Sequence, residues 1–335
     1  MSLSEVLSIR HPIIQAPMAG VTTPKFVASS AEAGVLGSIG AGYLSAEQTR
    51  AFIREVKALT AQPFSVNLFV PEQIEMSEEV LRQATEALQP IRRELGIMHD
   101  DISLSESEFD DQIQVIIEEN VKICSFTFGL PDRETIQLLK ANDVFLIGTA
   151  TTVEEAILAE KAGMDAVVAQ GSEAGGHRGS FHGALTFIPL NELLAAIVKV
   201  VSIPFIAAGG IVNKELMGDA FAAGASAVQI GTALLVSEES GAHPVHKKAM
   251  LTAIKGATVL TTVFSGKTAR GLQNQFTEEM KDVTIAPYPY QNDLTKALRK
   301  VAGSQGNQNY MSLWAGENVH LVGKGSVEEI LKKFV

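Results

Sequence analysis

Eight short apolar runs recur along the 335-residue chain, and each is bounded by glycine, proline or polar residues. They are Ile13–Ala19, Val35–Gly42, Phe64–Val70, Ile123–Gly129, Val144–Ala150, Ala166–Gly171, Pro204–Gly210 and Ala227–Leu234. None of them alternates steadily between polar and apolar positions. A parallel strand that is covered on both faces has this pattern, so we predict eight buried strands.

Stretches with helix start and stop signals lie between these strands. The sequence favours helices at Pro24–Ala33, Ala46–Leu59, Pro131–Lys140, Thr152–Ala162 and Lys214–Ala223. Thr152 and Asn213 are suitable N-caps, and Gly163 and Gly224 are suitable residues to end a helix. Repeated strand–helix units imply right-handed parallel connections. Eight strands favour an α/β fold that closes into a (β/α)8, or TIM, barrel.

Two spacings between predicted elements are too long for a single helix. Residues Glu72–Asn120 have room for two helices, and the stretch from Ser237 to Lys300 shows no barrel register. We therefore expect a TIM barrel made of residues 1–236 and 301–335, with a small, mostly helical lid domain inserted after the eighth strand at 237–300. The segment Ser326–Val335 has the pattern of a short closing helix.

Composition and charge restrict the class of protein. Hydrophobic residues make up 46% of the chain and charged residues 19%, as in a folded α/β protein. The net charge of −11, without clustered Lys and Arg, argues against nucleic acid as a partner. No apolar stretch is long enough for a membrane and no secretory signal opens the chain, so we expect a cytoplasmic protein. The single cysteine, Cys124, excludes an internal disulfide, and its place in a strand indicates a buried structural thiol.

Glycines and polar residues gather at the ends of the predicted strands, where barrels of this type hold their active sites. The loop from Gln170 to Gly179 contains four glycines, which let backbone N–H groups approach a ligand. Gly209 and Gly210 end the seventh strand, and Gly231 and Thr232 end the eighth. Because the loops after these two strands form the recurrent phosphate site of the fold, we predict a phosphate-bearing ligand there. Tight packing at the barrel rim is the alternative interpretation.

Of the seven histidines, His177 is the strongest candidate for a catalytic residue, because it lies in that glycine loop over the barrel mouth. An imidazole there can take a proton from a substrate carbon near pH 7. His182 has the character of a surface residue, and His11 precedes the first strand on the opposite, stability face. His243 and His246 have a His-x-x-His spacing, but no carboxylates lie directly beside them in the sequence. This spacing alone is weak evidence for a metal, and we predict no metal site.

Several motifs occur in barrel order and together resemble one known family, the bacterial class I nitronate monooxygenases, formerly called 2-nitropropane dioxygenases. The matching segments are Gln15–Gly20 with Thr22–Pro24, Gly37–Tyr43, Val66–Phe69, Ala169–Phe181, Ala207–Ile211 and Val228–Thr232. The segment Met311–Leu321 is similar to the tail of the family that returns to the flavin. The motifs run from the first strand to the eighth, which makes the resemblance more specific than any single motif.

This resemblance implies FMN as the cofactor. The implied contacts are Ala16, Pro17 and Met18 along the ring, then Asn67, Gln170, Gly175, Gly209, Gly210, Gln229, Ile230, Gly231 and Thr232. Among them the two glycine pairs and Thr232 would cradle the phosphate, and Asn67 and Gln170 would face the ring or the ribityl chain. His177 matches the active-site histidine of the family.

The resemblance also implies the oxidation of an alkyl nitronate, such as propionate 3-nitronate, by O2 to a carbonyl compound and nitrite, without NAD(P)H. His177 would remove the α-proton of a neutral nitroalkane, or position a nitronate and stabilise its charge. The insert does not align with the family, so Tyr288, Tyr290, Lys296 and Tyr310 are candidates both for the substrate pocket and for packing. Exposed barrel helices often pair, which leaves a homodimer open.

Three other classes of protein stand as alternatives. An FMN-dependent enoyl-acyl-carrier-protein reductase shares the barrel and a similar Gly-Gly-His loop but needs NAD(P)H, and Thr22–Pro24 and Arg178–Phe181 are more similar to the monooxygenase. A barrel of the inosinate dehydrogenase type needs a nucleophilic cysteine, for which Cys124 in a strand is a weak candidate. A flavin carrier without turnover would have no use for His177.

Overall fold

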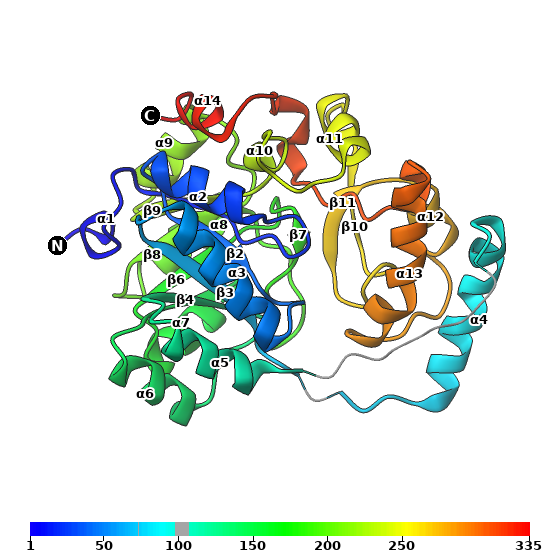
Figure 1. The fold of residues 1–335 in the computed structure, drawn as a ribbon, viewed down its shortest axis with the longest axis horizontal. Coiled ribbons are helices and arrows are strands. Elements are labelled where there is room, and N and C mark those ends of the chain that lie inside the picture. Colours follow the sequence, from blue (N-terminus) through cyan, green and yellow to red (C-terminus); the bar gives the residue numbers. More distant parts are fainter. Residues whose placement is uncertain (73, 98–106) are drawn as a thin grey trace.

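The computed structural model describes residues 1–72, 74–97 and 107–335. Its main body is an eight-stranded parallel sheet with the order β1-β9-β8-β6-β5-β4-β3-β2 (Figure 1). The strands are β1 (Ile13–Gln15), β2 (Gly37–Gly40), β3 (Phe64–Phe69), β4 (Ile123–Thr127), β5 (Phe145–Ala150), β6 (Ala166–Gln170), β8 (Phe205–Ala208) and β9 (Ala227–Ile230). A parallel bridge from Ile14 to Leu36, just before β2, joins the two ends of the sheet. The eight predicted strands and the (β/α)8 barrel are confirmed.

Helices cover the outside of the barrel. They are α2 (Pro24–Glu32), α3 (Ala46–Leu59), α5 (Phe109–Glu118), α6 (Arg133–Ala141), α7 (Val153–Ala162), α8 (Leu190–Ile197) and α9 (Lys214–Ala222). Thr152 and Asn213 cap α7 and α9 as predicted, because each side chain accepts a backbone N–H three residues further on. Gly163 ends α7 with a φ of +98°, in the left-handed region that favours glycine.

The inside of the barrel is filled from its amino-terminal end. Ile14, Val168 and Ile206 of the strands form a buried cluster with Leu3 of the short helix α1 (Leu3–Val6) and with Leu7, the residue that follows it. Val168 also lines the cavity described below, so this cluster forms part of the floor on which a ligand would rest. In β4, Cys124 has no exposed surface, as predicted, and its burial raises the pKa of the thiol.

The insert after β9 contains more than helices. Helix α10 (Thr232–Leu235) directly follows β9, and the helices of the insert are α11 (Pro244–Leu251), α12 (Gln275–Glu279) and α13 (Tyr290–Ser304), the last of which runs past residue 300. It also contains two strands that the sequence analysis did not predict, β10 (Thr258–Thr261) and β11 (Ala269–Leu272). Strand β11 pairs antiparallel with β10 and with β7 (Gly176–His177) in the loop after β6. One strand of the insert is thereby joined to the loop that carries His177.

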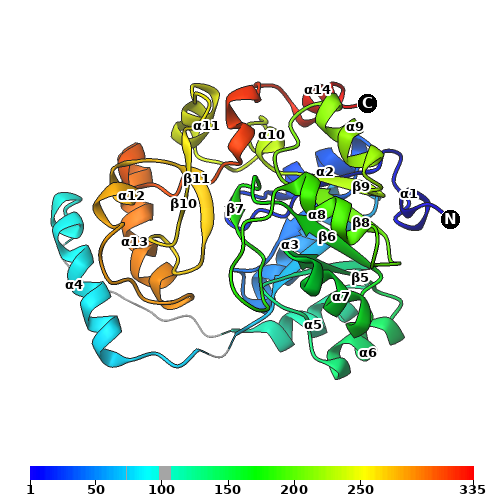
Figure 2. The ribbon, with the colours of Figure 1, turned by 180° about the vertical axis from the view of Figure 1, so that it is seen from behind.

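The long segment between β3 and β4 contains two helices, as predicted, namely α4 (Glu78–Glu94) and α5; residues 73 and 98–106 of it lie outside the described residues. Helix α5 covers β3, whereas α4 packs against α13, well away from the barrel (Figures 1 and 2). Tyr310, in the segment after α13, also bonds to α4, because its hydroxyl donates to Glu94 Oε2 at 2.8 Å. We call α4, β10, β11, α12 and α13 the lid.

The chain returns from the lid to the barrel through η1 (Gln308–Tyr310), η2 (Glu317–Leu321) and α14 (Val327–Leu331). Helix α14 is the predicted closing helix, and Ser326 forms a capping box with Glu329 at its start. Among the helices that the structure describes, none is both long and apolar enough to cross a membrane.

Candidate active site

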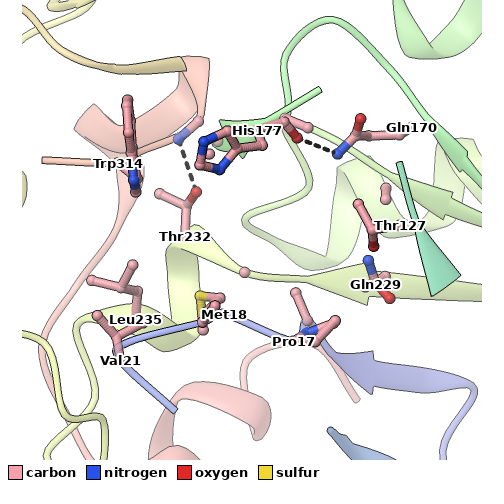
Figure 3. Close-up of a pocket in the computed structure, with 18 of the residues that line it drawn as sticks. Pro17, Met18, Val21, Thr127, Gln170, His177, Gln229, Thr232, Leu235 and Trp314 are labelled. Carbon is pink, nitrogen blue, oxygen red and sulfur yellow. Dashed lines mark hydrogen bonds between the residues drawn. The ribbon is translucent and has the colours of Figure 1, made fainter. Parts of the chain in front are cut away.

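A cavity of about 360 Å³ lies at the carboxyl ends of the barrel strands (Figure 3). It brings together Ala16, Pro17, Met18, Asn67, Gln170, Gly175, His177, Gly209, Gly210, Gln229, Gly231 and Thr232. These are all the predicted site residues except Ile230, whose side chain is buried in the core and does not line the cavity. Residues far apart in the sequence therefore meet at the place that the fold predicts for them.

One region of the cavity has free backbone donors. Gly209 and Gly210 have φ angles of +126° and +70°, which few residues other than glycine adopt. The N–H groups of Gly210, Gly231 and Thr232 make no hydrogen bond within the described part of the chain. Helix α10 begins at Thr232 and is four residues long, so it contributes its first free N–H groups and no extended helix dipole. This region can therefore accept a phosphate without rearranging the backbone.

The tail of the chain closes over this region. The backbone N–H of Gly316 donates to Thr232 Oγ1 at 2.9 Å (Figure 3), and Asn318 Nδ2 donates to the carbonyl oxygen of Gly210 at 2.8 Å. His246 on α11 donates from Nε2 to the carbonyl oxygen of Trp314 at 3.0 Å, and burial lowers the pKa of His246 to about 4. The tail therefore returns to the cavity, and it is held there by neutral His246, which the sequence analysis considered only as weak support for a metal.

The floor of the cavity is made of neutral polar side chains at the strand ends. The amide N–H groups of Asn67 donate to Ser125 Oγ at 2.9 Å and to Thr127 Oγ1 at 3.1 Å. Gln170 donates to the carbonyl oxygen of His177 at 3.1 Å and accepts the N–H of Gly179 at 2.8 Å. Both amides are thus occupied by the protein, and Gln170 positions the His177 loop.

Gln229 differs from these two amides. It lines the cavity from β9, and its side chain makes no hydrogen bond to any residue that the structure describes. A free amide that is aligned with the strand ends can donate to or accept from a bound ligand. Of the amides predicted to contact the cofactor, Gln229 is the one that keeps its full hydrogen-bonding capacity.

His177 is held in place by the lid. Its Nε2 lies 2.8 Å from Ser265 Oγ, and Ser265 donates its own proton to the carbonyl oxygen of Lys267 at 3.1 Å. Nε2 therefore carries the imidazole proton, and Nδ1 makes no hydrogen bond to a described residue. The rings of Phe128 and Trp314 pack on the imidazole at centroid distances of 5.7 and 5.4 Å.

The environment of His177 opposes a positive charge on the imidazole. Burial lowers the pKa of His177 to about 3, and the nearby charges of Arg299 and Lys267 add to the effect. The ring is therefore neutral near pH 7. A neutral imidazole of this kind is a weak base, since a base that works well has a conjugate acid with a pKa near the working pH.

The four candidate pocket residues of the insert have different positions. The ring centroid of Tyr288 lies 6.4 Å from that of His177 and 5.3 Å from that of Phe128, but Tyr288 does not line the cavity. Tyr310 is fully buried against α4, Lys296 is exposed, and Tyr290 is partly buried. None of these four is among the described residues that line the cavity.

The lid and the tail contribute lining residues that the sequence analysis did not select, chiefly Ser265, Asn292, Arg299 and Trp314. Tyr43, from the loop after β2, also lines the cavity; the residue is 41% exposed, and desolvation raises the pKa of its hydroxyl to about 12. Tyr43 lies in a segment that resembles the family, and that resemblance was the one signal available for it. A single Arg or Ser in an unaligned insert gives no such signal.

The fold and the cavity together define a (β/α)8-barrel enzyme with its site at the carboxyl ends of the strands. A sequence model described as "Nitronate monooxygenase" matches residues 1–335. A probable nitronate monooxygenase from Staphylococcus haemolyticus is 44% identical over 340 residues, which cover 99% of this chain and 95% of the relative. One from Staphylococcus aureus strain Newman is 44% identical over 339 residues, with 99% and 96% covered.

Solved structures agree with this result. A nitroalkane oxidase from Streptomyces ansochromogenes superimposes with a TM-score of 0.94 at 36% identity, covering 100% of this chain and 96% of the other. FabK from Thermotoga maritima gives a TM-score of 0.78 at 30% identity, covering 100% and 94%. The chain belongs to the nitronate monooxygenase family, whose members generally depend on a flavin, and it is an oxidoreductase.

Proposed function

We propose that the protein uses FMN to oxidise alkyl nitronates, such as propionate 3-nitronate, with O2 to carbonyl compounds and nitrite, without NAD(P)H. The observation that carries this proposal is that one cavity contains both a set of free backbone donors suited to a phosphate and a partly buried, neutral His177. Membership of the family supports the reaction class. The cavity supports the cofactor and the charge state of the substrate.

The residues of the cavity fit FMN. The free N–H groups of Gly210, Gly231 and Thr232 would hold its phosphate, and the free amide of Gln229 would contact its polar ring or ribityl atoms. Ala16, Pro17 and Met18 would lie along the ring, as an apolar wall. When bound, FMN supplies the electron acceptor for the nitronate and passes the electrons to O2.

His177 would act on the substrate as a neutral imidazole. Ser265 fixes the orientation of the ring through Nε2, which leaves Nδ1 for the substrate. Because the pKa of the His177 imidazole is lowered to about 3, the ring is a weak base, and its removal of a proton from a neutral nitroalkane is unfavourable near pH 7. A preformed nitronate needs no such step, so the site favours nitronates over neutral nitroalkanes.

The first experiment is to purify the protein, record its visible spectrum and follow O2 uptake and nitrite release on addition of a preformed alkyl nitronate. Flavin absorption bands with uptake in the absence of NAD(P)H are the expected result. O2 uptake or flavin reduction that requires NADH or NADPH and an enoyl thioester would contradict the proposal and favour the reductase alternative. A colourless protein that cannot be reconstituted with FMN would overturn the assignment of the cofactor.

The role of His177 is tested by His177→Ala, with His182→Ala as the matched control because His182 is exposed in the same loop. We expect His177→Ala to lower kcat/KM for a nitronate roughly 10- to 100-fold, since it removes a buried polar contact to the reacting group. FMN content and the His182→Ala enzyme should be unchanged. Equal activity of the two variants would exclude His177 from the reaction.

A further inference from the structure

The charge lining the cavity differs from the charge of the whole protein. The chain has a net charge of −11, yet no Asp or Glu is found among the described residues that line the cavity. In that same set, Arg299 is the single side chain with a permanent charge. A local positive charge in an acidic protein is a feature that attracts anions to one place.

Arg299 is held by neutral oxygen atoms. From α13, its Nε donates to Thr295 Oγ1 at 3.1 Å, and its Nη2 donates to the carbonyl oxygen and to Oδ1 of Asn292 at 2.9 and 2.8 Å. The guanidinium makes no ion pair within 4.0 Å with any residue in the described ranges, and Nη1 makes no hydrogen bond there. Tyr43 and Asp293 act on the guanidinium electrostatically without an ion pair to it, and the effect of Tyr43 is the larger. Two N–H groups of a fixed cation are thus left for a ligand.

The position of Arg299 relates it to the reacting part of the cavity. Its charge acts on His177 and on Tyr43, both of which line the cavity. These two residues are distinct from the free backbone donors near Gly210, to which we assign the phosphate. Arg299 is partly buried, and burial lowers the pKa of its guanidinium, which stays charged. A partly buried charge without an ionic partner costs free energy, and a bound anion offsets that cost.

Lys267 provides an internal comparison. It is the other cation whose charge reaches His177, but its Nζ forms an ion pair with Glu72 Oε2 at 2.9 Å and lies 4.7 Å from the centre of the Phe128 ring. Lys267 does not line the cavity. The two cations therefore differ in whether a carboxylate already compensates them.

We propose that Arg299 is the specificity-determining cation of the site: its free N–H groups bind the negative oxygens of a planar anionic substrate beside His177. The chemical class of ligand is a small oxyanion with its charge on two or three coplanar oxygens, which a nitronate satisfies and an uncharged nitroalkane does not. This assignment rests on the proposed function for the identity of the substrate. It divides the work between Arg299, which carries the charge, and His177, which stays neutral.

The first test uses nitrate, a planar oxyanion that the enzyme cannot oxidise. The purified flavin-loaded protein is titrated with nitrate by calorimetry and by the fluorescence of Trp314, which is the only tryptophan of the sequence and lines the cavity. We expect Arg299→Met to weaken binding roughly 10- to 100-fold, the range for loss of hydrogen bonds to a charged group. Arg299→Lys should retain most of the affinity, and Lys267→Met should change it less than about threefold because Glu72 already compensates Lys267.

The second test measures nitronate turnover in the same variants. In Arg299→Met, KM for a preformed nitronate should rise by the same factor as the nitrate dissociation constant, while the FMN content of the purified variant matches that of the unmodified protein. Arg299→Gln provides a second uncharged side chain that can still donate to Asn292, in case Arg299→Met fails to fold. The FMN content serves as the control for general damage to the site.

Three results would overturn the role of Arg299. They are failure of the unmodified protein to bind millimolar nitrate, unchanged nitrate affinity in Arg299→Met and Arg299→Gln, and an equal loss of affinity in Lys267→Met. The outcome is distinct from a failure of the proposed function. Nitrate binding that depends on Arg299, in a protein that consumes no O2 with any nitronate, would remove the proposed reaction and keep the anion site.

Discussion

The barrel and the lid provide different kinds of group to the same cavity. The barrel contributes backbone N–H groups at Gly210 and Gly231 and neutral side chains such as Asn67 and Gln229. The lid and its connections contribute Ser265, which fixes His177, and Arg299, which carries a permanent charge. A ligand held by backbone is insensitive to most substitutions, whereas one recognised by two or three side chains is easily changed. The barrel half therefore suits a cofactor, and the lid half suits the choice of substrate.

The two halves meet at the histidine loop. Residue His177 lies on β7, which pairs with β11 of the lid, and the loop also depends on Gln170 at the end of β6. The tail adds a second junction, because Gly316 bonds to Thr232 and the carbonyl of Trp314 accepts from His246. Changes in the barrel should therefore affect cofactor binding first, and changes in the lid should affect turnover with the cofactor still bound.

The largest effect is expected from Gly210→Ala in the barrel half. The φ of +70° at Gly210 is strained for alanine, and an added Cβ would lie 3.1 Å from Glu173 Cβ and 3.2 Å from Asn318 Nδ2. We expect FMN affinity to fall about 100-fold, because backbone strain and the shift of Asn318 move the free donors, a cost of about 1–3 kcal/mol. The measurement is a titration of the apoprotein with FMN.

Gly218→Ala is the matched control for this prediction. Gly218 lies in α9, and a Cβ placed there meets no atom within 4 Å, so FMN affinity should be unchanged. If Gly210→Ala binds FMN as tightly as the Gly218→Ala protein, the phosphate lies elsewhere. That result would remove the contrast between a backbone half and a side-chain half.

The next effect concerns stability against acid and the junction at His246. The folded-state pKa of His246 is about 4, below the ordinary value of 6.5, so below pH 6.5 the unfolded chain binds a proton that the folded protein does not. Stability is therefore lost as the pH falls from 6.5 to about 4, at up to about 1.4 kcal/mol per pH unit for this group. We expect Tm to fall between pH 7 and pH 5, and to fall less in His246→Gln, whose amide can still donate to Trp314. Equal decreases in Tm would assign the acid sensitivity to other groups.

The barrel half was predictable from the sequence because the carboxyl ends of all the strands lie at the same end of a closed barrel, so small errors in the strand bounds do not matter. Runs such as Val35–Gly42 and Ala227–Leu234 identified the strands, and glycines such as Gly210 marked the close approaches. Ile230, also predicted to contact the cofactor, does not line the cavity, and the reason is physical. Neighbouring residues of a strand face opposite sides, so Gln229 can face the cavity only if the side chain of Ile230 faces the core.

The lid half was not predictable in the same way. Strands β10 and β11 are four residues long, too short to give a clear period, and β11 is specified by pairing with β7 nearly a hundred residues earlier. The packing of α4 on α13 also joins distant segments. Arg299 looks like any helical arginine in the sequence, because what distinguishes it is the absence of a carboxylate beside it among the described residues, which only the tertiary structure shows.

A smaller effect on turnover is expected from Ser265→Ala in the lid half. The substitution removes the partner of His177 Nε2, so the ring can rotate or change tautomer while FMN binding is untouched. We expect kcat/KM for a nitronate to fall roughly 3- to 10-fold, as for the loss of one neutral hydrogen bond. Ser312→Ala is the control, since Ser312 also lines the cavity and makes no hydrogen bond to His177. A loss of flavin in Ser265→Ala would show that the lid also holds the cofactor and would weaken the comparison.

The smallest effect on activity is expected from Cys124→Ala. The thiol lies in β4 with no exposed surface, its pKa is raised by burial, and it is separate from the residues that line the cavity. Removing the sulfur should lower the free energy of unfolding by about 1 kcal/mol, the typical cost of a small cavity, and leave FMN content and kcat/KM unchanged. Denaturant unfolding and nitronate kinetics measure the two quantities. Loss of turnover with the flavin retained would instead favour a cysteine nucleophile, and it would place essential chemistry in the barrel half, where our comparison expects only binding.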